Sequence, residues 1–489
     1  MNKNITAFIP YNGYEHTSKT IDNLLSSEVV KNVILITTDK DIESIKDCKI
    51  IYTKSFSSTD TVRLISEKSD TDYTVILTQD NLLELGQFAL ERFYNVAENS
   101  GAGLVYSDYY EIKNGVTEQH PVIDYQLGSL CDDFNFGHLL FYRTEAIKKS
   151  LLGENLEYNS AGLYNLRLRI SQSFPIVRIP EFLYTSIESD VRKSGVKQFD
   201  YVDPKNREVQ IEMENAVTEH LKKIGAYLSP NFKQIDLNEE EFEFEVSVII
   251  PVKNRVGTIT DAVESVLIQK TDFKFNLIVV DNYSDDGTTE KLKLFAKDNS
   301  KLIHLIPERK DLGIGGCWNE AVHNQNCGKF SAQLDSDDIY ANENTLQDIV
   351  NKFREERCAM IVGSYKITDF DLNEIPPGLI DHKEWTPDNG RNNALRINGL
   401  GAPRAFYTPL LRKIKIPNVS YGEDYAVGLA ISRNYQIGRI YHSIYLCRRW
   451  EGNSDAALDI VKANNHNLYK DRVRTFEVLA RQRMNYANG

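Results

Sequence analysis

The sequence lacks the cysteine spacing of a metal cluster or a disulfide framework. Its six cysteines are scattered and none forms a C-x-x-C pair, which argues against a zinc site and against a disulfide-stabilised secreted domain. We therefore expect free thiols in a reducing compartment. The opening residues, Met-Asn-Lys-Asn-Ile-Thr, do not resemble a signal peptide, and no apolar run approaches the ~20 residues of a membrane span. These absences predict a cytoplasmic protein, and contact with the inner face of the membrane, if any, would be peripheral.

An excess of positive charge is also absent. The 57 Lys and Arg residues against 70 Asp and Glu residues give a net charge of −13, which argues against a general nucleic-acid or anionic-membrane binder. An anionic substrate must then be met by a local group of cations or by a metal ion. The length of 489 residues predicts two to four domains, and the hydrophobic content of 41% is ordinary for a globular protein.

The second half of the chain alternates between strand-like and helix-like segments. Strands rich in β-branched or apolar residues are predicted at 246–252, 275–281, 302–307 and 330–334. A helical pattern follows the first, third and fourth of them, and a polar loop follows the second; Thr258 with Asp261 resembles a capping box before the first helix. This alternation predicts an α/β fold with a mostly parallel sheet and right-handed crossovers.

The first half repeats this plan in the same order. Five pairs of segments correspond: 5–12 with 246–254, 33–37 with the second strand at 275–281, 75–81 with 334–338, 138–149 with 403–414, and 159–171 with 420–432. Two copies at a long period predict a duplicated domain and not a solenoid. The predicted organisation is a degenerate copy at 1–235, an acidic linker at 236–245, a catalytic copy at 246–457 and a helical extension at 458–489.

The two copies differ in their acids. Where the second copy has Asp335, the first has Thr78, and where the second has Glu423 and Asp424, the first has Gly162 and Leu163. We interpret the first copy as a domain that kept its core and lost its metal site. A different ligand for that copy and a purely structural role are both open.

Three carboxylates directly follow the last predicted strand, those of Asp335, Asp337 and Asp338. Acids this close repel one another, and a hard divalent cation such as Mg²⁺ or Mn²⁺ relieves the repulsion. The alternative is a solvated acidic turn before the next helix. Other polar or glycine-rich segments also stand at strand ends, where parallel strands bring ligands together: 251–255, Asp281 and 313–316.

These segments resemble glycosyltransferase family 2, whose fold is called GT-A. The resemblance covers roughly 246–457, and six segments match family motifs in order: VSVIIPVKNR (246–255), VVDNYSDDGT (279–288), DLGIGGCWNEAV (311–322), LDSDD (334–338), YGEDY (421–425) and LCRRWEGNSDA (446–456). It implies two tandem GT-A-like, Rossmann-like domains, of which the second moves a sugar from a nucleoside diphosphate donor with inversion at the anomeric carbon.

The resemblance also implies roles for individual residues. Asp424 would be the general base with Glu423 beside it, although acids at a helix N-terminus also have a structural explanation. Asp337 and Asp335 would hold Mn²⁺ or Mg²⁺. The nucleotide sugar would contact Pro251, Asn254, Asp281, Asp285, Gly313, Asp335, Arg448 and Arg449.

One position departs from the family pattern. Trp450 stands where the family often has a metal-binding histidine, and an indole N–H is a donor that cannot ligate a metal. Either Asp337, phosphate oxygens and water complete the metal site, or His442 reaches it.

The acceptor region is expected at 376–404, with Trp385 and Arg404 as contacts; a plain insertion packed by Trp385 is the alternative. The basic segment 464–484 either packs on the first copy or touches a membrane surface.

The leading hypothesis is therefore an inverting, metal-dependent glycosyltransferase. It would use a UDP- or GDP-sugar and a glycan or lipid-linked acceptor, in the synthesis of cell-surface polysaccharide or glycoconjugate. A sugar nucleotidyltransferase is the alternative enzyme, and a glycan-binding scaffold is the alternative without catalysis.

Overall fold

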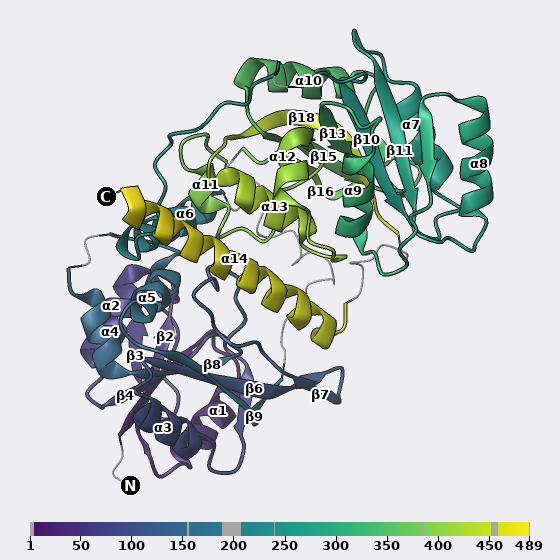
Figure 1. Cartoon of the computed structure of the whole chain (residues 1–489). Coiled ribbons are helices and arrows are strands. Elements are labelled where there is room, and N and C mark those ends of the chain that lie inside the picture. The colour runs from purple at the N-terminus through teal and green to yellow at the C-terminus, as the bar shows by residue number, and fades with distance from the viewer. Residues whose placement is uncertain are drawn as a thin grey trace. The chain divides into compact units, whose positions relative to one another are not determined.

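The computed structural model describes residues 4–153, 156–187, 207–238, 240–383, 385–450 and 458–488. The chain divides into two compact units (Figure 1). Unit 1 comprises Met1–Lys193, Glu208–Tyr227 and Leu458–Gly489, and unit 2 comprises Ser194–Arg207 and Leu228–Ala457.

Unit 2 opens with four strands separated by helices, as the sequence predicts, and continues with five further strands of two to twelve residues. Its elements in chain order are β10 (Val246–Val252), α7 (Ile259–Leu267), β11 (Phe275–Asp281), α8 (Thr288–Asp298), β12 (Leu302–Leu305), α9 (Ile314–His323), β13 (Phe330–Gln333), β14 (Ile339–Tyr340), α10 (Thr345–Glu356), β15 (Met360–Thr368), β16 (Glu374–Ile380), α11 (Gly390–Asn393), β17 (Arg404–Tyr407), α12 (Thr408–Ile414), α13 (Glu423–Ser432) and β18 (Ile437–Arg448).

The sheet of unit 2 has the strand order β12-β11-β10-β13-β17-β15-β18-β14, and β16 pairs with β15. The first four strands are parallel, and most of their side chains are buried on both faces, as is typical of parallel sheets covered by helices. β17 then runs antiparallel to β13 and to β15. The sheet is therefore mixed, and its parallel part is the one that alternation of strand and helix predicts.

Unit 1 contains a similar series of elements, without described counterparts of α8 and α11 and with two further helices, α6 and α14. Its elements are β1 (Ile5–Pro10), α1 (His16–Leu25), β2 (Val30–Thr37), β3 (Lys49–Tyr52), α2 (Thr59–Lys68), β4 (Tyr73–Leu77), β5 (Leu82–Leu85), α3 (Ala89–Ser100), β6 (Leu104–Lys113), β7 (Val116–His120), β8 (Leu139–Arg143), α4 (Thr144–Leu151), α5 (Gly162–Ser171), β9 (Ile176–Ile187), α6 (Arg207–Lys223) and α14 (Ile460–Asn488).

The strand order of unit 1, β3-β2-β1-β4-β8-β6-β9-β5, repeats that of unit 2 strand for strand. The register repeats too: Ile5 pairs with Tyr73 as Val246 pairs with Phe330. A buried hydroxyl pair recurs at one position, Thr74 with Thr144 in unit 1 and Ser331 with Thr408 in unit 2, each at 2.8 Å. Two tandem GT-A-like α/β domains are thus confirmed.

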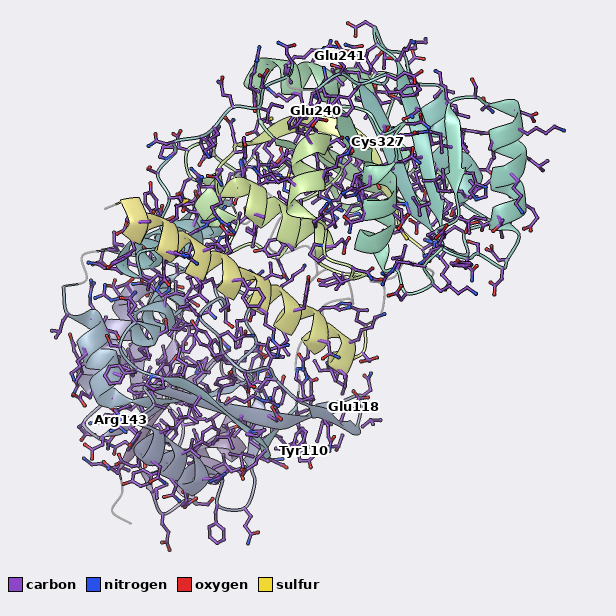
Figure 2. All side chains as sticks on the ribbon, viewed as in Figure 1. Tyr110, Glu118, Arg143, Glu240, Glu241 and Cys327 are labelled. Carbon is purple, nitrogen blue, oxygen red and sulfur yellow. The ribbon has the colours of Figure 1, made fainter. Side chains whose placement is uncertain are left out.

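Aromatic side chains fill much of unit 1. The buried rings of Phe93 and Phe141 stack in its core with centroids 5.6 Å apart, and the half-buried Tyr110 and Arg143, labelled in Figure 2, lie outside this core. The core of the first copy is therefore intact although its acids have changed.

Residues from Leu228 onward group with unit 2, a few residues before the predicted junction. The backbone of Leu228 exchanges two hydrogen bonds with the side-chain amide of Asn392, and Arg391 donates to the carbonyl oxygens of Ser229 and Asn231. These bonds tie the segment before the acidic run to α11.

Candidate functional site

The acidic loop Asp335–Asp338 follows β13, and residues of β18 hold it in place by hydrogen bonds. The hydroxyl of Tyr445 donates to Asp338 Oδ2 at 2.8 Å and accepts from the backbone N–H of Asp335. The backbone N–H of Arg448 donates to Asp338 Oδ1 at 2.7 Å. Burial and the charges of Asp335 and Asp337 raise the pKa of Asp338 well above its usual value. Asp338 is thus a structural acid of the loop.

Arg448 was predicted to bind the diphosphate, but its side chain is buried and turned toward the loop. Its Nε donates to the carbonyl oxygen of Asp337 at 2.6 Å, and its Nη1 pairs with Asp261 Oδ2 at 2.6 Å. The predicted capping box at Thr258 is absent because the Thr258 hydroxyl donates instead to the carbonyl oxygen of Ser336. The Arg448 guanidinium and the Thr258 hydroxyl therefore anchor the acidic loop to the start of α7.

Asp335 and Asp337 have different surroundings on this loop. Asp335 Oδ1 accepts a hydrogen bond from Gln333 Nε2 at 2.9 Å. Burial raises the pKa of Asp335 and the charge of Asp337 adds to the effect, while Arg404 opposes it. Asp337 Oδ2 lies 3.3 Å from the indole Nε1 of Trp450 and 3.8 Å from Arg255 Nε. Trp450 thus donates a hydrogen bond to the acid that the family pattern assigns to the metal.

The Glu-Asp pair begins α13, as predicted, with Gly422 at the N-cap in the left-handed region at φ 77°. Asp424 Oδ2 lies 2.6 Å from Arg404 Nη1. Glu423 is buried, and burial together with the charge of Asp424 raises its pKa to about 8. Its Oε2 is buried and has no hydrogen-bond partner among the described residues. The two acids are therefore electrostatically distinct although they are adjacent.

Arg404 sits between the two acidic groups. Burial alone would lower the pKa of its guanidinium, but the carboxylates of Asp424, Asp335 and Glu423 outweigh burial and raise it. Its backbone N–H donates to Gln333 Oε1, the same amide that binds Asp335. Arg404 consequently links the strand end that carries the acidic loop to the helix that carries Asp424.

A cavity of about 300 Å³ contains both acidic groups. Seven predicted site residues line it: Pro251, Asp335, Asp337, Arg404, Glu423, Asp424 and Arg449. The other lining residues include apolar side chains such as Trp318, Phe406 and Val427, and polar ones such as Arg255 and Gln333. Carboxylates, the three arginines Arg255, Arg404 and Arg449, and apolar side chains meet in one concave site, which is the usual character of a small-molecule site.

The loops after β10 and β11 bond to each other, and of their residues Arg255 lines this cavity. Asn254, at φ 55°, accepts from the backbone N–H of Asp285 at 2.9 Å and donates its own N–H to Ser284 Oγ. Asp281 is buried, and hydrogen bonds from Thr289, Ser284 and His304 outweigh burial and lower its pKa. The predicted nucleoside contacts therefore form a preorganised loop pair beside the cavity.

The glycine-rich turn at 313–316 packs closely against the backbone of residues 417–419. A Cβ on Gly313 would lie 2.6 Å from the carbonyl carbon of Val419, and one on Gly315 would lie 1.9 Å from the carbonyl oxygen of Pro417. The backbone N–H of Gly313 donates to Asn418 Oδ1 at 2.7 Å. Close packing against 417–419, just before the Glu-Asp pair, thus accounts for these glycines.

Trp385, predicted to contact the acceptor, is only 5% exposed. The guanidinium of Arg439 lies 4.1 Å from its ring centre, and a Cβ on Gly390 would lie 2.1 Å from the ring. These contacts correspond to the alternative in which Trp385 packs the insertion, whereas Arg404 lines the cavity.

Three neighbours of the acids were not among the predicted site residues. Gln333 binds both Asp335 and Arg404, Tyr445 binds Asp335 and Asp338, and Arg255 approaches Asp337. Gln333 and Tyr445 lie within strands, where a lone polar residue in an apolar run is the available signal. That signal does not indicate which partner the residue will meet.

The equivalent loop of unit 1 is Thr78–Asn81. Its one acid, Asp80, accepts hydrogen bonds from other residues of unit 1. Asp80, at the position of Asp337, accepts from the backbone N–H of Asn12 at 2.8 Å and from Thr17 Oγ1 at 2.6 Å. His16 Nε2 lies 3.5 Å from Asp80 Oδ1. The acid left in the first copy is therefore already satisfied within unit 1.

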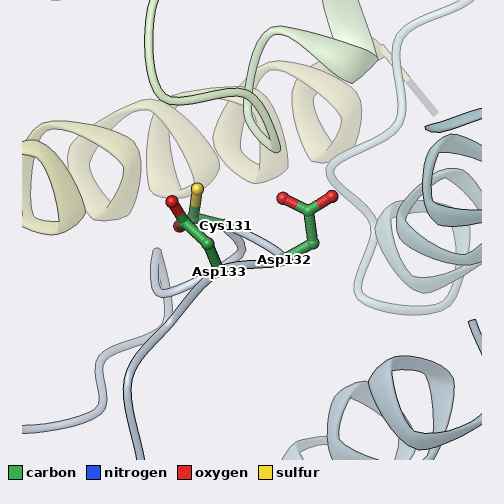
Figure 3. Close-up of side chains that lie close together, drawn as sticks. All are labelled: Cys131, Asp132 and Asp133. Carbon is green, nitrogen blue, oxygen red and sulfur yellow. The ribbon is translucent and has the colours of Figure 1, made fainter. Parts of the chain in front are cut away.

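A second acidic cluster lies elsewhere in unit 1. Cys131, Asp132 and Asp133 bring a thiol and two carboxylates within 4.8 Å of one another (Figure 3). Burial and the charge of Asp133 raise the pKa of the Cys131 thiol well above its usual value. Because a metal binds the thiolate and not the thiol, these three residues do not extend the metal chemistry predicted for unit 2.

Among the residues that the structure describes, no helix combines the length and the apolar character that crossing a bilayer requires. The longest described helix, α14, is rich in charged residues.

The fold and the acidic cavity define a GT-A-like domain in unit 2. Residues 247–413 match the family model Glycosyl transferase family 2, and unit 2 therefore carries a domain of that family.

Two relatives and one solved structure illustrate the similarity. An uncharacterized glycosyltransferase of Rickettsia felis is 34% identical over 245 residues, which cover 48% of this chain and 39% of that protein. The UDP-Glc:alpha-D-GlcNAc-diphosphoundecaprenol beta-1,3-glucosyltransferase WfgD of Escherichia coli is 27% identical over 238 residues, which cover 48% of this chain and 86% of that protein. A crystal structure of S. aureus TarS in complex with UDP-GlcNAc is 25% identical and covers 48% of this chain and 72% of that chain, with a TM-score of 0.37.

Proposed function

We propose that unit 2 transfers a sugar from a nucleoside diphosphate sugar to a hydroxyl group of a glycan or a lipid-linked acceptor. The transfer inverts the anomeric carbon and uses Mg²⁺ or Mn²⁺. One observation carries most of the support: the acids of the Asp335–Asp338 loop and the Glu423-Asp424 pair, far apart in the sequence, line one cavity of about 300 Å³.

The metal would be held by Asp337 with Asp335. Two carboxylates on one loop, one of them with a pKa raised by burial and by its neighbour's charge, form the crowded oxygen site that a hard cation favours. Trp450 supplies no ligand, so the remaining ligands would be phosphate oxygens and water. When bound, the cation would neutralise charge on the departing diphosphate.

Asp424 would act as the general base. An acceptor hydroxyl is a poor nucleophile near neutral pH, and a placed carboxylate that takes its proton contributes typically ~10²–10⁴-fold in rate. Arg404 holds the Asp424 carboxylate by one oxygen, Oδ2. Glu423, with a pKa of about 8, is largely protonated at neutral pH and so leaves the basic role to Asp424.

The donor would lie along the β10 and β11 strand ends. Pro251 and Arg449 line the cavity itself, and Arg449 offers forked donors to a phosphate. Asn254, Asp281 and Asp285 belong to the adjoining loop pair, where the base and ribose would bind. In this proposal Arg448 acts through the acidic loop and does not touch the diphosphate.

The name of one relative supports the proposed class of acceptor. The E. coli protein is named for transfer from UDP-Glc to a GlcNAc linked to diphosphoundecaprenol, which favours a UDP-sugar and a lipid-linked acceptor in the synthesis of cell-surface polysaccharide. Transfer to such an acceptor would take place at the cytoplasmic face of the membrane. Unit 1, with Asp80 already satisfied, would support unit 2 without catalysis.

A direct test uses the full chain with Mn²⁺ and a panel of UDP- and GDP-sugars, and measures release of nucleoside diphosphate. We expect turnover with one donor, and loss of turnover in Asp337→Asn and Asp424→Asn proteins whose circular dichroism is unchanged. Release of pyrophosphate would instead indicate a nucleotidyltransferase. Full activity of Asp424→Asn would remove the role given to that residue.

A further inference from the structure

The long helix α14 belongs to unit 1 and is labelled in Figure 1. The burial of its side chains is the reverse of the usual pattern for a surface helix. Its inward face is charged, because five ionisable residues are buried, each no more than 7% exposed: Lys470, Asp471, Arg474, Glu477 and Arg481. Two ion pairs along the helix, Asp471 with Arg474 and Glu477 with Arg481, both at 2.7 Å, neutralise much of this face.

Specific bonds fix the rotation of α14 about its axis. Ser129 Oγ donates to Asp471 Oδ2 at 2.6 Å, and the backbone N–H of Gly128 donates to Thr475 Oγ1 at 2.9 Å. A Cβ on Gly128 would lie 2.2 Å from the backbone nitrogen of Thr475, so the two backbones are in close contact. Gln482 also donates to the carbonyl oxygen of Ile224. The helix therefore cannot turn its apolar residues inward without losing these contacts.

The opposite face of the helix carries large apolar side chains. Phe476 is 68% exposed, Leu479 is 50% exposed and Tyr486 is 91% exposed. With Arg472 and Arg483, which are also exposed, they form the outer stripe of α14. At 100° per residue these five positions fall within an arc of about 80°. The stripe combines aromatic, aliphatic and basic side chains and contains no carboxylate.

We propose that the outer stripe of α14 binds the surface of an anionic lipid bilayer. Helices that lie in the membrane interface carry Phe, Leu or Trp with Lys or Arg, and arginine keeps its charge at the headgroups while its methylene groups cover apolar surface. The chain as a whole is acidic, with a net charge of −13, so a stripe without acids is a local exception that matches anionic headgroups.

A second copy of the chain is a poorer partner for the stripe. Two-fold pairing of two such stripes would bring arginines together with no carboxylate on either stripe to compensate them. The proposal stands apart from the transfer reaction, since vesicle binding requires neither donor nor metal.

The test is co-sedimentation of the full chain with vesicles of phosphatidylcholine, pure or mixed equally with phosphatidylglycerol. We expect binding to the mixed vesicles and weak binding to the neutral ones. The double variant Phe476→Ser with Leu479→Ser should lower the partition coefficient by about tenfold or more. Arg472→Gln with Arg483→Gln should lose on the order of tenfold, on the anionic vesicles only.

A matched control removes equivalent apolar surface elsewhere in unit 1. Phe88, 70% exposed, and Leu25 on α1 are both exposed apolar residues outside α14. The variant Phe88→Ser with Leu25→Ser should bind vesicles as the native chain does, and all variants should keep the native melting temperature.

Two results would overturn the proposal. One is a native chain that stays in the supernatant with anionic vesicles, or an outer-stripe variant that binds as well as the native chain. The other is light scattering that shows a native dimer and a monomeric Phe476→Ser, Leu479→Ser variant, because the stripe would then be covered by a second copy.

Discussion

Arg404 Nη1 lies 2.6 Å from Asp424 Oδ2 and is the cation that lies between the acidic loop and the Glu-Asp pair. The shared register of the two sheets places Leu140 at the equivalent position of unit 1. The first copy has thus replaced the cation as well as the acids that the cation pairs with. Arg404 belongs to the same functional unit as Asp335 and Asp424.

Replacement of Arg404 should therefore lower activity more than stability. Arg404→Leu, which installs the residue of the first copy, should reduce kcat/KM by on the order of 10²-fold, because Asp424 loses the group that orients it. Arg404→Lys keeps the charge without the fork and should lose less. Initial rates and melting temperatures measured together test this. An Arg404→Leu enzyme of native activity would show that Asp424 needs no such partner.

The buried acid Glu423 should make stability depend on pH. Its pKa is raised from 4.5 to about 8 in the folded protein by burial and by the charge of Asp424. The folded state therefore holds this proton more tightly than the unfolded state, and stability falls as pH rises from about 4.5 to about 8. Asp335 and Asp338, whose pKa values are also raised, act in the same direction.

Glu423→Gln isolates the contribution of that residue. Glutamine resembles the protonated acid, so the variant should match the native melting temperature at pH 5 and exceed it by several degrees at pH 8.5. Thermal melts in EDTA from pH 5 to pH 9 give this difference. A difference that does not change across that range would mean that Glu423 titrates normally.

Trp450 should compete with the metal for Asp337. Its indole N–H donates to Asp337 Oδ2 at 3.3 Å, and a cation on this oxygen would repel the indole proton and weaken the bond. Loss of one such bond is worth ~0.5–1.5 kcal/mol, so Trp450→Phe should bind Mn²⁺ about two- to tenfold more tightly in calorimetry with UDP present. Weaker binding in the variant would show instead that Trp450 supports the metal site.

The fold and the main acids could be predicted from the sequence because they depend on local pattern. Buried parallel strands such as 246–252 read as apolar runs, and a strand that ends in Asp335 must place that acid at the carboxyl edge of the sheet. The repeated order of segments predicted the duplication, and the structure repeats even the register of Ile5 with Tyr73.

The orientation of individual side chains and the contacts between distant segments could not be predicted from the sequence. Arg448 is two residues from Trp450, yet it turns inward to the carbonyl oxygen of Asp337. Position 315 must be glycine because a Cβ there would collide with the carbonyl oxygen of Pro417, which lies about a hundred positions further along the chain. Trp385 packs in its own insertion. Each of these contacts depends on which distant segment of the chain packs nearby in the fold. The spacing of residues along the sequence does not give that information.

The most direct measurement is calorimetric titration of the full chain with UDP and, in parallel, with GDP, in the presence of Mn²⁺. If only the second copy retains a donor site, one nucleotide binds with a stoichiometry of one per chain. Binding is then lost in Asp337→Ala and retained in Asp80→Asn, the matched change in the first copy. A stoichiometry of two, or undiminished binding by Asp337→Ala, would contradict the assignment of the site to the acidic loop of unit 2.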